Sequence, residues 1–245
     1  MKIALLGYGK MGQEIEKLAE KRQHEIILII DSLEDWETKG QGLKEADVAI
    51  DFSMPGSVVD NIHHCFDAGV PVVVGTTGWH EELEAVKKTC EERNQTLLYS
   101  PNFSIGVNLF FDLNRYFAKL MAKWKEYGIS IEETHHVHKQ DAPSGTAIML
   151  ANDIIRIIER KEKWVRESPE HPEELGIKSY RTENVAGTHV VRYESENDSI
   201  EIIHKAKSRR GFALGALMVA EWMKGKKGFL EMHEFLCSQN LTTMI

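Results

Sequence analysis

Cysteine is scarce in this sequence. The 245 residues include three cysteines, Cys65, Cys90 and Cys237, which are far apart and form no CxxC pair. An odd number at such spacing does not make a disulfide framework, and it is typical of proteins from a reducing compartment. We therefore expect a cytoplasmic protein.

Long apolar runs and a basic surface are also lacking. No apolar run approaches the roughly 18 to 20 residues that cross a bilayer, and the residues after Met1 do not resemble a signal peptide. The net charge is −8, and phosphate backbones bind basic surfaces. We therefore expect a soluble protein with no membrane partner and no nucleic-acid partner. Its length is sufficient for one large or two modest domains.

The amino-terminal residues match a dinucleotide-binding pattern. An apolar strand over residues 2–6 runs directly into a glycine-rich turn and then a helix with periodic apolar residues. The turn consists of Gly7, Tyr8, Gly9, Lys10, Met11 and Gly12. In a GxGxxG turn the first glycine permits the bend, the second admits a pyrophosphate, and the third lets the helix pack on the strand. The alternative is that these glycines only make a turn.

Asp31 extends this pattern. It follows an apolar strand over residues 26–30 and lies 19 residues after Gly12, where a carboxylate can accept hydrogen bonds from an adenosine ribose. No arginine adjoins it, so a 2′-phosphate would meet a negative charge. The sequence therefore favours NADH over NADPH, although Lys39 could soften this preference.

Strand and helix signals alternate over the first hundred residues. Further strands are expected at 48–52, 70–74 and 96–99, with helices between them and a short polar connection over 32–45. This alternation predicts an α/β fold, a Rossmann-type doubly wound parallel sheet. Two loops follow strand ends, where such sheets bind ligands, although the first could be a simple turn. The candidate contacts in these loops are Gly75, Thr76, Thr77, Ser100, Pro101, Asn102 and Phe103.

The pattern changes after residue 104. A long helix is expected over 105–127, and the stretch 160–174 is polar. Strands are expected at 178–183, 187–194 and 199–206, and their short links indicate an antiparallel or mixed sheet. We expect a second α+β domain over 104–213 for substrate binding and oligomerisation. The dinucleotide-binding domain would then comprise 1–103 and about 214–245.

The segment from Glu133 to Ala147 carries most of the groups that can move protons. It reads as a strand, a loop and a helix, and its loop contains His135, His136, His138 and Lys139. The free N–H groups of Ser144, Gly145 and Thr146 at the helix start would attract a carboxylate or phosphate. Together these groups suit a small acidic substrate whose reaction needs a proton.

Two other interpretations of this segment remain open. The histidines could be surface or satisfied core residues, with a solvated lysine. His136 and His138 share one face of a strand and could bind zinc, but no cysteine lies nearby and no HExxH pattern occurs. We expect no metal.

These residues resemble the signature of the 4-hydroxy-tetrahydrodipicolinate reductase (dihydrodipicolinate reductase) family, which has the form E-[IV]-x-E-x-H-H-x-x-K-x-D-x-P-S-G-T-A. The sequence departs from it at the first position, where Ser130 replaces glutamate. The resemblance extends to the glycine-rich turn, the GTTG loop at 75–78, the segment 102–108 and the segment 209–216. It covers most of the chain.

The resemblance implies NAD(P)H-dependent reduction of 4-hydroxy-tetrahydrodipicolinate in diaminopimelate and lysine biosynthesis. It implies that His135 is an acid/base and that Lys139 is the proton donor. Lys139, His136, Gly145 and Thr146 would hold the carboxylates of a small dicarboxylate substrate. The cofactor would contact the glycine-rich turn, Asp31, the two loops and Arg209. It also implies a homotetramer formed through the second domain's sheet.

Two competing hypotheses remain, and the second of them belongs to a different class. One is another two-domain NAD(P)-dependent reductase of a small amino or keto acid. The other is a non-catalytic NAD-binding sensor, which the acidic charge and the absence of a DNA-binding motif disfavour.

Overall fold

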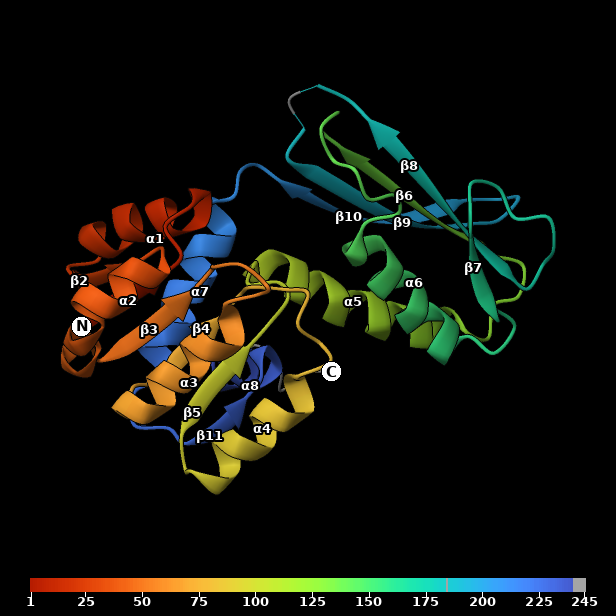
Figure 1. The fold of residues 1–245 in the computed structure, drawn as a ribbon. Helices are drawn as coiled ribbons and strands as arrows, with labels where there is room; N and C mark the ends of the chain where they lie inside the picture. Colours follow the sequence, from red (N-terminus) through yellow and green to blue (C-terminus); the bar gives the residue numbers. More distant parts are fainter. Residues whose placement is uncertain (184, 240–245) are drawn as a thin grey trace. The chain divides into compact units, whose positions relative to one another are not determined.

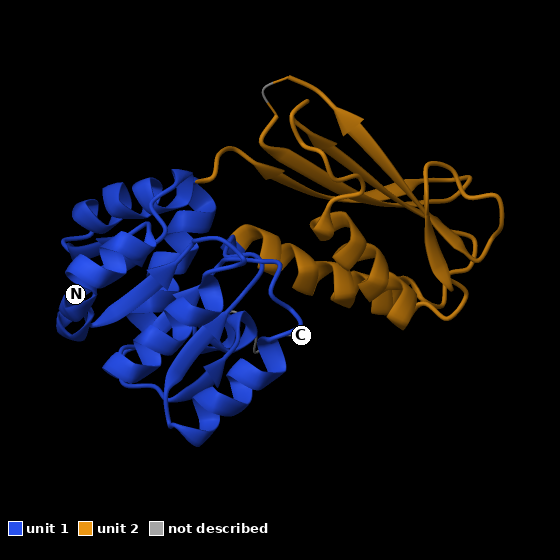
Figure 2. Cartoon of the chain, in the orientation of Figure 1, with its two compact units in different colours: residues 1–105, 210–245 blue, residues 106–209 orange. Residues whose placement is uncertain are grey.

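A computed structural model describes residues 1–183 and 185–239. The chain forms two compact units (Figure 2). Unit 1 contains Met1–Ile105 and the described residues from Arg210 onward, and unit 2 contains Gly106–Arg209. The chain therefore leaves unit 1 once and returns to it once. None of the helices in the described ranges has the length and apolar character needed to cross a membrane.

Unit 1 is built on a six-stranded parallel sheet with the order β11-β5-β4-β3-β1-β2 (Figure 1). The strands are β1 (Lys2–Leu6), β2 (Glu25–Ile30), β3 (Val48–Asp51), β4 (Val72–Val74), β5 (Thr96–Tyr99) and β11 (Gly228–Leu230). Strand order reverses between β1 and β3, because the chain passes from β1 outward to β2 and then returns to the other side of β1. Ligands bind at the carboxyl ends of the strands at such a point. The predicted Rossmann-type sheet is confirmed.

Helices enclose this sheet. They are α1 (Lys10–Lys21), α2 (Leu33–Lys39), α3 (Val58–Ala68), α4 (Leu83–Glu92), α7 (Arg210–Trp222) and α8 (Met232–Ser238). Alternate strand residues point to opposite faces, and Ala4, Leu6, Val72 and Val74 share one buried cluster with residues of α3 and α4. The returning helix α7 packs beside α1. Glu221 ties them together by accepting hydrogen bonds from Arg22 at 2.7 and 2.8 Å.

Three short elements of unit 1 were not predicted. The expected polar connection over 32–45 contains α2 and a 3-10 helix (Gly40–Glu45). Ser32 caps α2 by accepting the N–H of Asp35 at 3.2 Å, so local hydrogen bonds rather than an apolar face define this helix. Strand β11 has three residues, too few to show a period. Helix α3 begins at Val58.

Unit 2 has a five-stranded mixed sheet with the order β10-β9-β6-β8-β7. Its strands are β6 (Gly128–His135), β7 (Lys163–Arg166), β8 (Glu174–Arg181), β9 (Gly187–Glu194) and β10 (Ser199–Ala206). Strand β8 runs parallel to β6 and β7, whereas β9 is antiparallel to β6 and β10. The sequence predicted a mixed sheet but missed β7, which lies inside the polar stretch 160–174, and placed the start of β8 four residues late.

Helices cover one face of this sheet. Helices α5 (Ile105–Met121) and α6 (Gly145–Ile157) share a buried cluster with Ile131, Ile177 and Tyr193 of the sheet, and Figure 1 shows both on the same side of it. Helix α5 ends at Met121, six residues before the predicted end. On the other face Val190 pairs with Ile203, whose exposed fraction is 48%. No helix among the described residues of unit 2 covers this face.

Candidate active site

Strand β6 places two titratable side chains inside unit 2. Its residues alternate in burial, so that Glu133 and His135 point to the same side as the core residue Ile131. Glu133 is 1% exposed and His135 is 7% exposed. The loop after β6 brings the start of α6 back against this pair.

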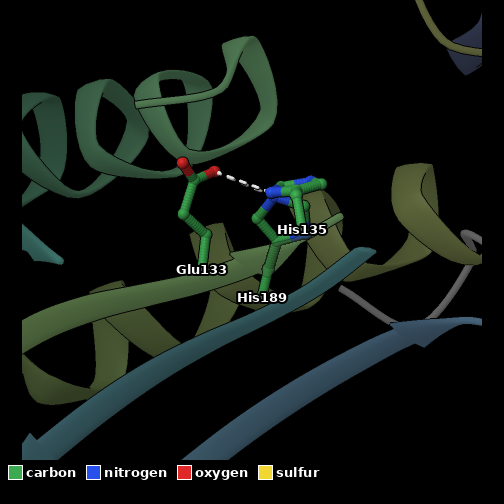
Figure 3. Close-up of side chains that lie close together, drawn as sticks. All are labelled: Glu133, His135 and His189. Carbon is green, nitrogen blue, oxygen red and sulfur yellow. Dashed lines mark ion pairs between the residues drawn. The ribbon is translucent and has the colours of Figure 1, made fainter. Parts of the chain in front are cut away.

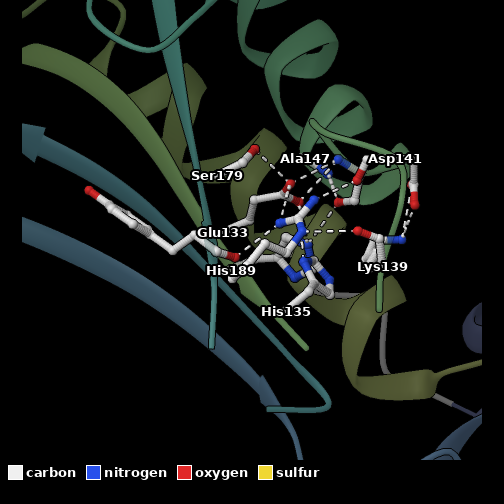
Figure 4. Close-up of polar contacts among 10 residues, drawn as sticks. Glu133, His135, Lys139, Asp141, Ala147, Ser179 and His189 are labelled. Atoms are coloured by element: carbon white, nitrogen blue, oxygen red, sulfur yellow. Dashed lines mark hydrogen bonds and ion pairs between the residues drawn. The ribbon is translucent and has the colours of Figure 1, made fainter. Parts of the chain in front are cut away.

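Glu133 is the centre of the polar contacts (Figure 4). It accepts the backbone N–H of Ser144 at 3.0 and 3.1 Å and the hydroxyl of Ser179 at 2.8 Å. Arg181 lies 3.9 Å away. Burial alone would raise the pKa of Glu133, but His189, Ser144 and Ser179 outweigh it and lower this pKa to about 2. The carboxylate is therefore ionised at neutral pH.

Two imidazoles converge on this carboxylate (Figure 3). His135 Nδ1 and His189 Nε2 each lie 3.6 Å from Glu133 Oε2, and the rings are 5.0 Å apart. His189 Nε2 is also 3.1 Å from Ser144 Oγ. Burial and the nearby charge of His189 lower the pKa of His135 to about 4, with smaller contributions from Lys139 and Arg181, while Glu133 opposes them. His135 is therefore neutral at pH 7.

The same three residues could be considered as metal ligands, because their candidate ligand atoms all lie within 4.8 Å of one another. The hydrogen bonds argue for proton chemistry instead: both oxygens of Glu133 already accept an N–H, and one accepts a hydroxyl as well. The zinc interpretation of His136 and His138 loses its basis, because β6 ends at His135 and both lie in the following loop. They line an open pocket with Val137, Glu183, Val185 and Ala186.

Lys139 lies in the loop after β6. Its ammonium contacts both oxygens of Asp141, at 2.7 and 2.9 Å. Arg181 fixes the backbone of this loop by donating to the carbonyls of Lys139 at 3.2 Å and of Asp141 at 2.6 Å. The sequence analysis did not identify Arg181, because it lies 42 residues away from Lys139 along the chain.

The start of α6 differs from the prediction at one residue. Ser144 is buried and its N–H is taken by Glu133, so this donor is not free as expected. Its hydroxyl caps the helix by accepting the N–H of Ala147 at 3.2 Å. The exposed Gly145 and half-buried Thr146 supply the remaining donors of the first turn. Fewer backbone N–H groups are thus free to attract an anion at the start of α6 than the sequence suggested.

The glycine-rich turn in unit 1 fits a dinucleotide. Gly7 has φ +88°, and a Cβ there would lie 2.5 Å from the carbonyl oxygen of Phe52; at Gly12 it would lie 2.4 Å from the oxygen of Gly7. At Gly9 a Cβ would meet nothing within 4 Å, so the backbone is open to a diphosphate. Lys10 and Met11 begin α1, the first exposed and the second half-buried.

Asp31 joins this turn to α2. It accepts the N–H of Tyr8 at 2.6 Å, and its own N–H donates to Asp35 at 2.9 Å. Asp35 also holds the ammonium of Lys39 at 2.6 Å. Lys39, which the sequence left as a possible partner of a 2′-phosphate, therefore already has a carboxylate partner.

In the first predicted loop, Thr76 faces inward. Its hydroxyl donates to the buried Asp51 at 2.6 Å, which also accepts from Asn61 at 2.8 Å. Gly75 packs against the ring of Phe52, where a Cβ would lie 2.2 Å away. Only Thr77 of the three predicted residues is exposed. Asp51 and Phe52 lie at the strand end beside β1 and were missed, because they read as part of a buried strand.

In the second loop, Ser100 and Phe103 are buried. Ser100 donates its hydroxyl to the carbonyl of Asn102 at 2.9 Å. Phe103 is 1% exposed, whereas Pro101 is exposed. Arg209 is exposed after β10 at the end of unit 2, and its role as a cofactor contact stays a prediction.

The comparisons with known proteins agree along the chain. Residues 1–103 match the family described as dihydrodipicolinate reductase, N-terminus, and residues 106–236 match dihydrodipicolinate reductase, C-terminus. The 4-hydroxy-tetrahydrodipicolinate reductase of Christiangramia forsetii is 45% identical over 236 residues, which cover 96% of this chain and 98% of the relative. The enzyme of the same name from Archaeoglobus fulgidus is 39% identical over 78% of this chain and 76% of its own.

A solved structure supports the fold. The dipicolinate-bound dihydrodipicolinate reductase from Paenisporosarcina aligns with a TM-score of 0.72 at 23% identity, and the alignment covers 94% of this chain and 97% of that chain. The matches to both halves and the full-length relative confirm the resemblance read from the sequence. The chain belongs to the dihydrodipicolinate reductase family.

Proposed function

We propose that this protein reduces 4-hydroxy-tetrahydrodipicolinate to tetrahydrodipicolinate with NAD(P)H, a step in diaminopimelate and lysine biosynthesis. The observation that carries the proposal is the strand–loop–helix segment of unit 2. It brings a buried neutral imidazole, a lysine and a helix amino terminus onto 12 consecutive residues, 135–146. The family membership of the whole chain supports the same reaction.

The substrate is a dicarboxylate, and three groups in unit 2 suit its anions. The N–H groups of Gly145 and Thr146 lie at the positive end of α6. The ammonium of Lys139 is held by Asp141, whose side chain is 57% exposed. A substrate carboxylate can therefore replace Asp141 as the partner of Lys139 without breaking a buried ion pair. His136, in the same loop as Lys139, completes the proposed set.

The chemistry requires one proton transfer on the enzyme. Loss of water from the hydroxylated ring gives a conjugated imine, and the nicotinamide, when bound, supplies the hydride. The resulting enamine must then gain a proton. Lys139 is the proposed donor, because it is a cation that also binds the substrate. His135 is the proposed acid/base: it is neutral before binding, and a dianionic substrate beside it would favour its protonated form.

Cofactor binding is assigned to the carboxyl ends of β1, β2, β4 and β5. The open backbone at Gly9 suits the diphosphate. We propose that NADH is preferred, because Asp31 and Asp35 place two carboxylates near the ribose position and Asp35 already pairs Lys39. Thr77, Pro101 and the loop backbones are the exposed candidates nearer the nicotinamide.

The assembly and location of the protein are also proposals. A homotetramer formed through the sheet of unit 2 is supported by the uncovered face that carries Val190 and Ile203. A cytoplasmic location is supported by three cysteines that are all free.

The test is to follow NADH and NADPH oxidation while a dihydrodipicolinate synthase makes the substrate from pyruvate and aspartate semialdehyde. Consumption of either cofactor that depends on the synthase supports the reductase. If both cofactors bind but neither is consumed, the proposal fails, and a sensor or a reductase with another substrate takes its place.

Two variants separate catalysis from cofactor binding. Lys139→Ala and His135→Ala are expected to lower kcat by about 100-fold or more, the usual range for a missing general acid or base, with unchanged NADH binding by fluorescence titration. Loss of NADH affinity in these variants would contradict the assigned roles.

A further inference from the structure

Two buried residues of the Glu133 cluster have no role in the proposed reaction. We propose that Glu133 and His189 are positioning residues for His135: Glu133 fixes the ring with Nδ1–H toward the carboxylate, and His189 holds that carboxylate from the opposite strand. This inference rests on the proposed function, in which the Nε2 of His135 is then the nitrogen that meets the substrate.

The carboxylate of Glu133 cannot reorient freely. Its donors come from two different parts of unit 2: the N–H of Ser144 before α6 and the hydroxyl of Ser179 on β8. Oε1 accepts both of them, whereas Oε2 accepts only the long bond from Ser144 and faces the two imidazoles at 3.6 Å. Oε2 is therefore a fixed acceptor aimed at His135.

The tautomer of His135 follows from this charge. A neutral imidazole carries one N–H and one bare lone pair. Nδ1 of His135 is buried and has no hydrogen-bond partner among the described residues. A lone pair at Nδ1 would face an ionised carboxylate and be repelled, so the proton belongs at Nδ1. Contacts of this kind are often long without substrate and tighten when it binds.

The other nitrogen of His135 lies beside a residue that has no side chain. Gly187, at the start of β9, would place a Cβ 3.2 Å from Nε2 and 3.3 Å from Cδ2. The strand that carries His189 thus has no side chain against Nε2. With Nδ1 committed to Glu133, Nε2 is the nitrogen left for proton exchange.

His189 connects this pair to the helix start. Its Nε2 lies 3.1 Å from the hydroxyl of Ser144, which caps α6, and 3.6 Å from Oε2 of Glu133. Its ring meets that of His135 edge to face. Removing His189 would free one side of the carboxylate and of the His135 ring.

The charged groups around His135 allow a test that distinguishes a positioning role of Glu133 and His189 from a purely structural one. Four groups face it: Glu133 on β6, His189 on β9, Arg181 on β8 and Lys139 in the loop. Glu133 raises the pKa of His135, whereas His189, Lys139 and Arg181 lower it. Glu133→Gln and His189→Gln should therefore move its titration in opposite directions.

The experiment measures the titration of His135 by NMR of the imidazole C–H, assigned by its loss in His135→Gln, from pH 9 to well below pH 4, because the wild-type pKa is about 4. It also measures kcat and KM between pH 4 and 9. Glu133→Gln is expected to move the titration to lower pH and to lower kcat about 100-fold. His189→Gln should move it to higher pH and lower kcat about 10-fold, the lower end for a residue that orients a functional group. KM for NADH should change less than about twofold in both. His171→Gln, exposed and remote from the site, is the matched control.

Titrations that move in the same direction, or not at all, would overturn the proposal, as would an unchanged kcat in both variants. Glu133→Asp is a second variant in case Glu133→Gln does not fold. It keeps the negative charge but moves the carboxylate away from His135, so kcat should fall while the pKa of His135 moves less than in Glu133→Gln. If the wild-type protein consumes no cofactor, the proposed function fails, and the NMR titrations alone still decide whether Glu133 and His189 position His135.

Discussion

Gly187, which has no side chain, lies directly beside the ring of His135. Gly187 and His135 belong to strands β9 and β6, which pair in the sheet of unit 2. The 3.2 Å separation calculated for a Cβ at this position is shorter than ordinary van der Waals contact. The ring is otherwise enclosed by Glu133 and His189, so it has little freedom to move away.

Replacing Gly187 by alanine should therefore disturb catalysis, and it also adds backbone strain, because the φ of Gly187 is +157°. We expect kcat to fall about 10-fold, because small displacements of a reacting group cost large factors in rate, with the thermal midpoint lowered by a few degrees. Gly128→Ala is the control: a Cβ there meets its nearest atom at 3.6 Å, in the same sheet. Equal effects of the two substitutions on kcat would contradict this explanation.

The low pKa of His135 also links stability to pH. Because the folded value of about 4 lies below the ordinary 6.5, the unfolded chain binds more protons between these values. The contribution of His135 to stability is thus complete above pH 6.5 and is lost as the pH falls toward 4. Glu133, with a pKa of about 2 against 4.5, loses its contribution only below pH 4.5.

We expect the wild type to lose about 2 kcal/mol more than His135→Asn in its free energy of unfolding between pH 7.5 and pH 5. Urea unfolding followed by circular dichroism at both pH values measures this difference. Equal losses in the two proteins would mean that His135 is not held neutral in the folded protein.

At the scale of elements, helix α2 has the largest consequence for function. Its first turn places Asp35 against the N–H of Asp31, and its last turn places Lys39 against Asp35. Lys39 is four residues after Asp35, the spacing at which helical side chains meet. Helix α2 therefore places a second carboxylate, that of Asp35, near the proposed ribose position, and this carboxylate pairs with Lys39.

Asp35→Ser should release Lys39 and remove one negative charge. We expect the ratio of kcat/KM for NADPH to that for NADH to rise about fivefold, because one repelling charge is removed and the ammonium of Lys39 becomes available to a 2′-phosphate. Glu37→Ser, on the same helix and exposed, is the control for net charge. If the NADPH-to-NADH ratio of kcat/KM is unchanged in Asp35→Ser, then Asp35 does not contribute to the proposed preference for NADH and Asp31 alone would account for it.

The sequence predicted the elements that carry strong periodicity or a functional motif. Strand β1 and the glycine-rich turn were placed correctly, because buried strands and special backbone positions restrict residue choice locally. Strand β6 was recognised, but it extends to His135, which the sequence analysis placed in the following loop. It missed α2, β7 and β11, which are short and depend on caps or on neighbouring strands.

The same distinction applies to the candidate site. His135 and Lys139 share one segment and a recognisable spacing, so they were found. His189, Ser179 and Arg181 meet Glu133 only through strand pairing. Nothing in their local sequence shows that β6, β8 and β9 are neighbours. The free N–H predicted for Ser144 was wrong for the same reason, since its acceptor, Glu133, is brought there by the fold.

At the scale of the whole molecule, the uncovered face of the sheet in unit 2 is the candidate surface for assembly. Val190 on β9 and Ile203 on β10 are paired there. A mixed polar and apolar sheet face without a covering helix can be buried by a second copy of itself, as closed symmetric assemblies require.

Ile203→Asp is expected to convert the proposed tetramer into smaller species, because a carboxylate buried in an interface without a partner is strongly unfavourable. Sedimentation velocity at micromolar protein measures the change. Met149→Asp introduces the same charge at an apolar residue of α6 that is 41% exposed, and it should leave the mass unchanged. A monomeric wild type would refute the assembly itself.

The return of the chain to unit 1 has a consequence for biosynthesis on the ribosome. Strand β11, which pairs with β5 at the edge of the first sheet, and helix α7, which packs beside α1, are both translated after every residue of unit 2. The nascent chain must therefore hold β5 with an unpaired edge and α1 with an uncovered apolar side while more than a hundred further residues emerge. Unit 2, whose strands are contiguous in the chain, can close first and unit 1 last, so the dinucleotide-binding half is the part of this protein most exposed to chaperones and proteases during its synthesis.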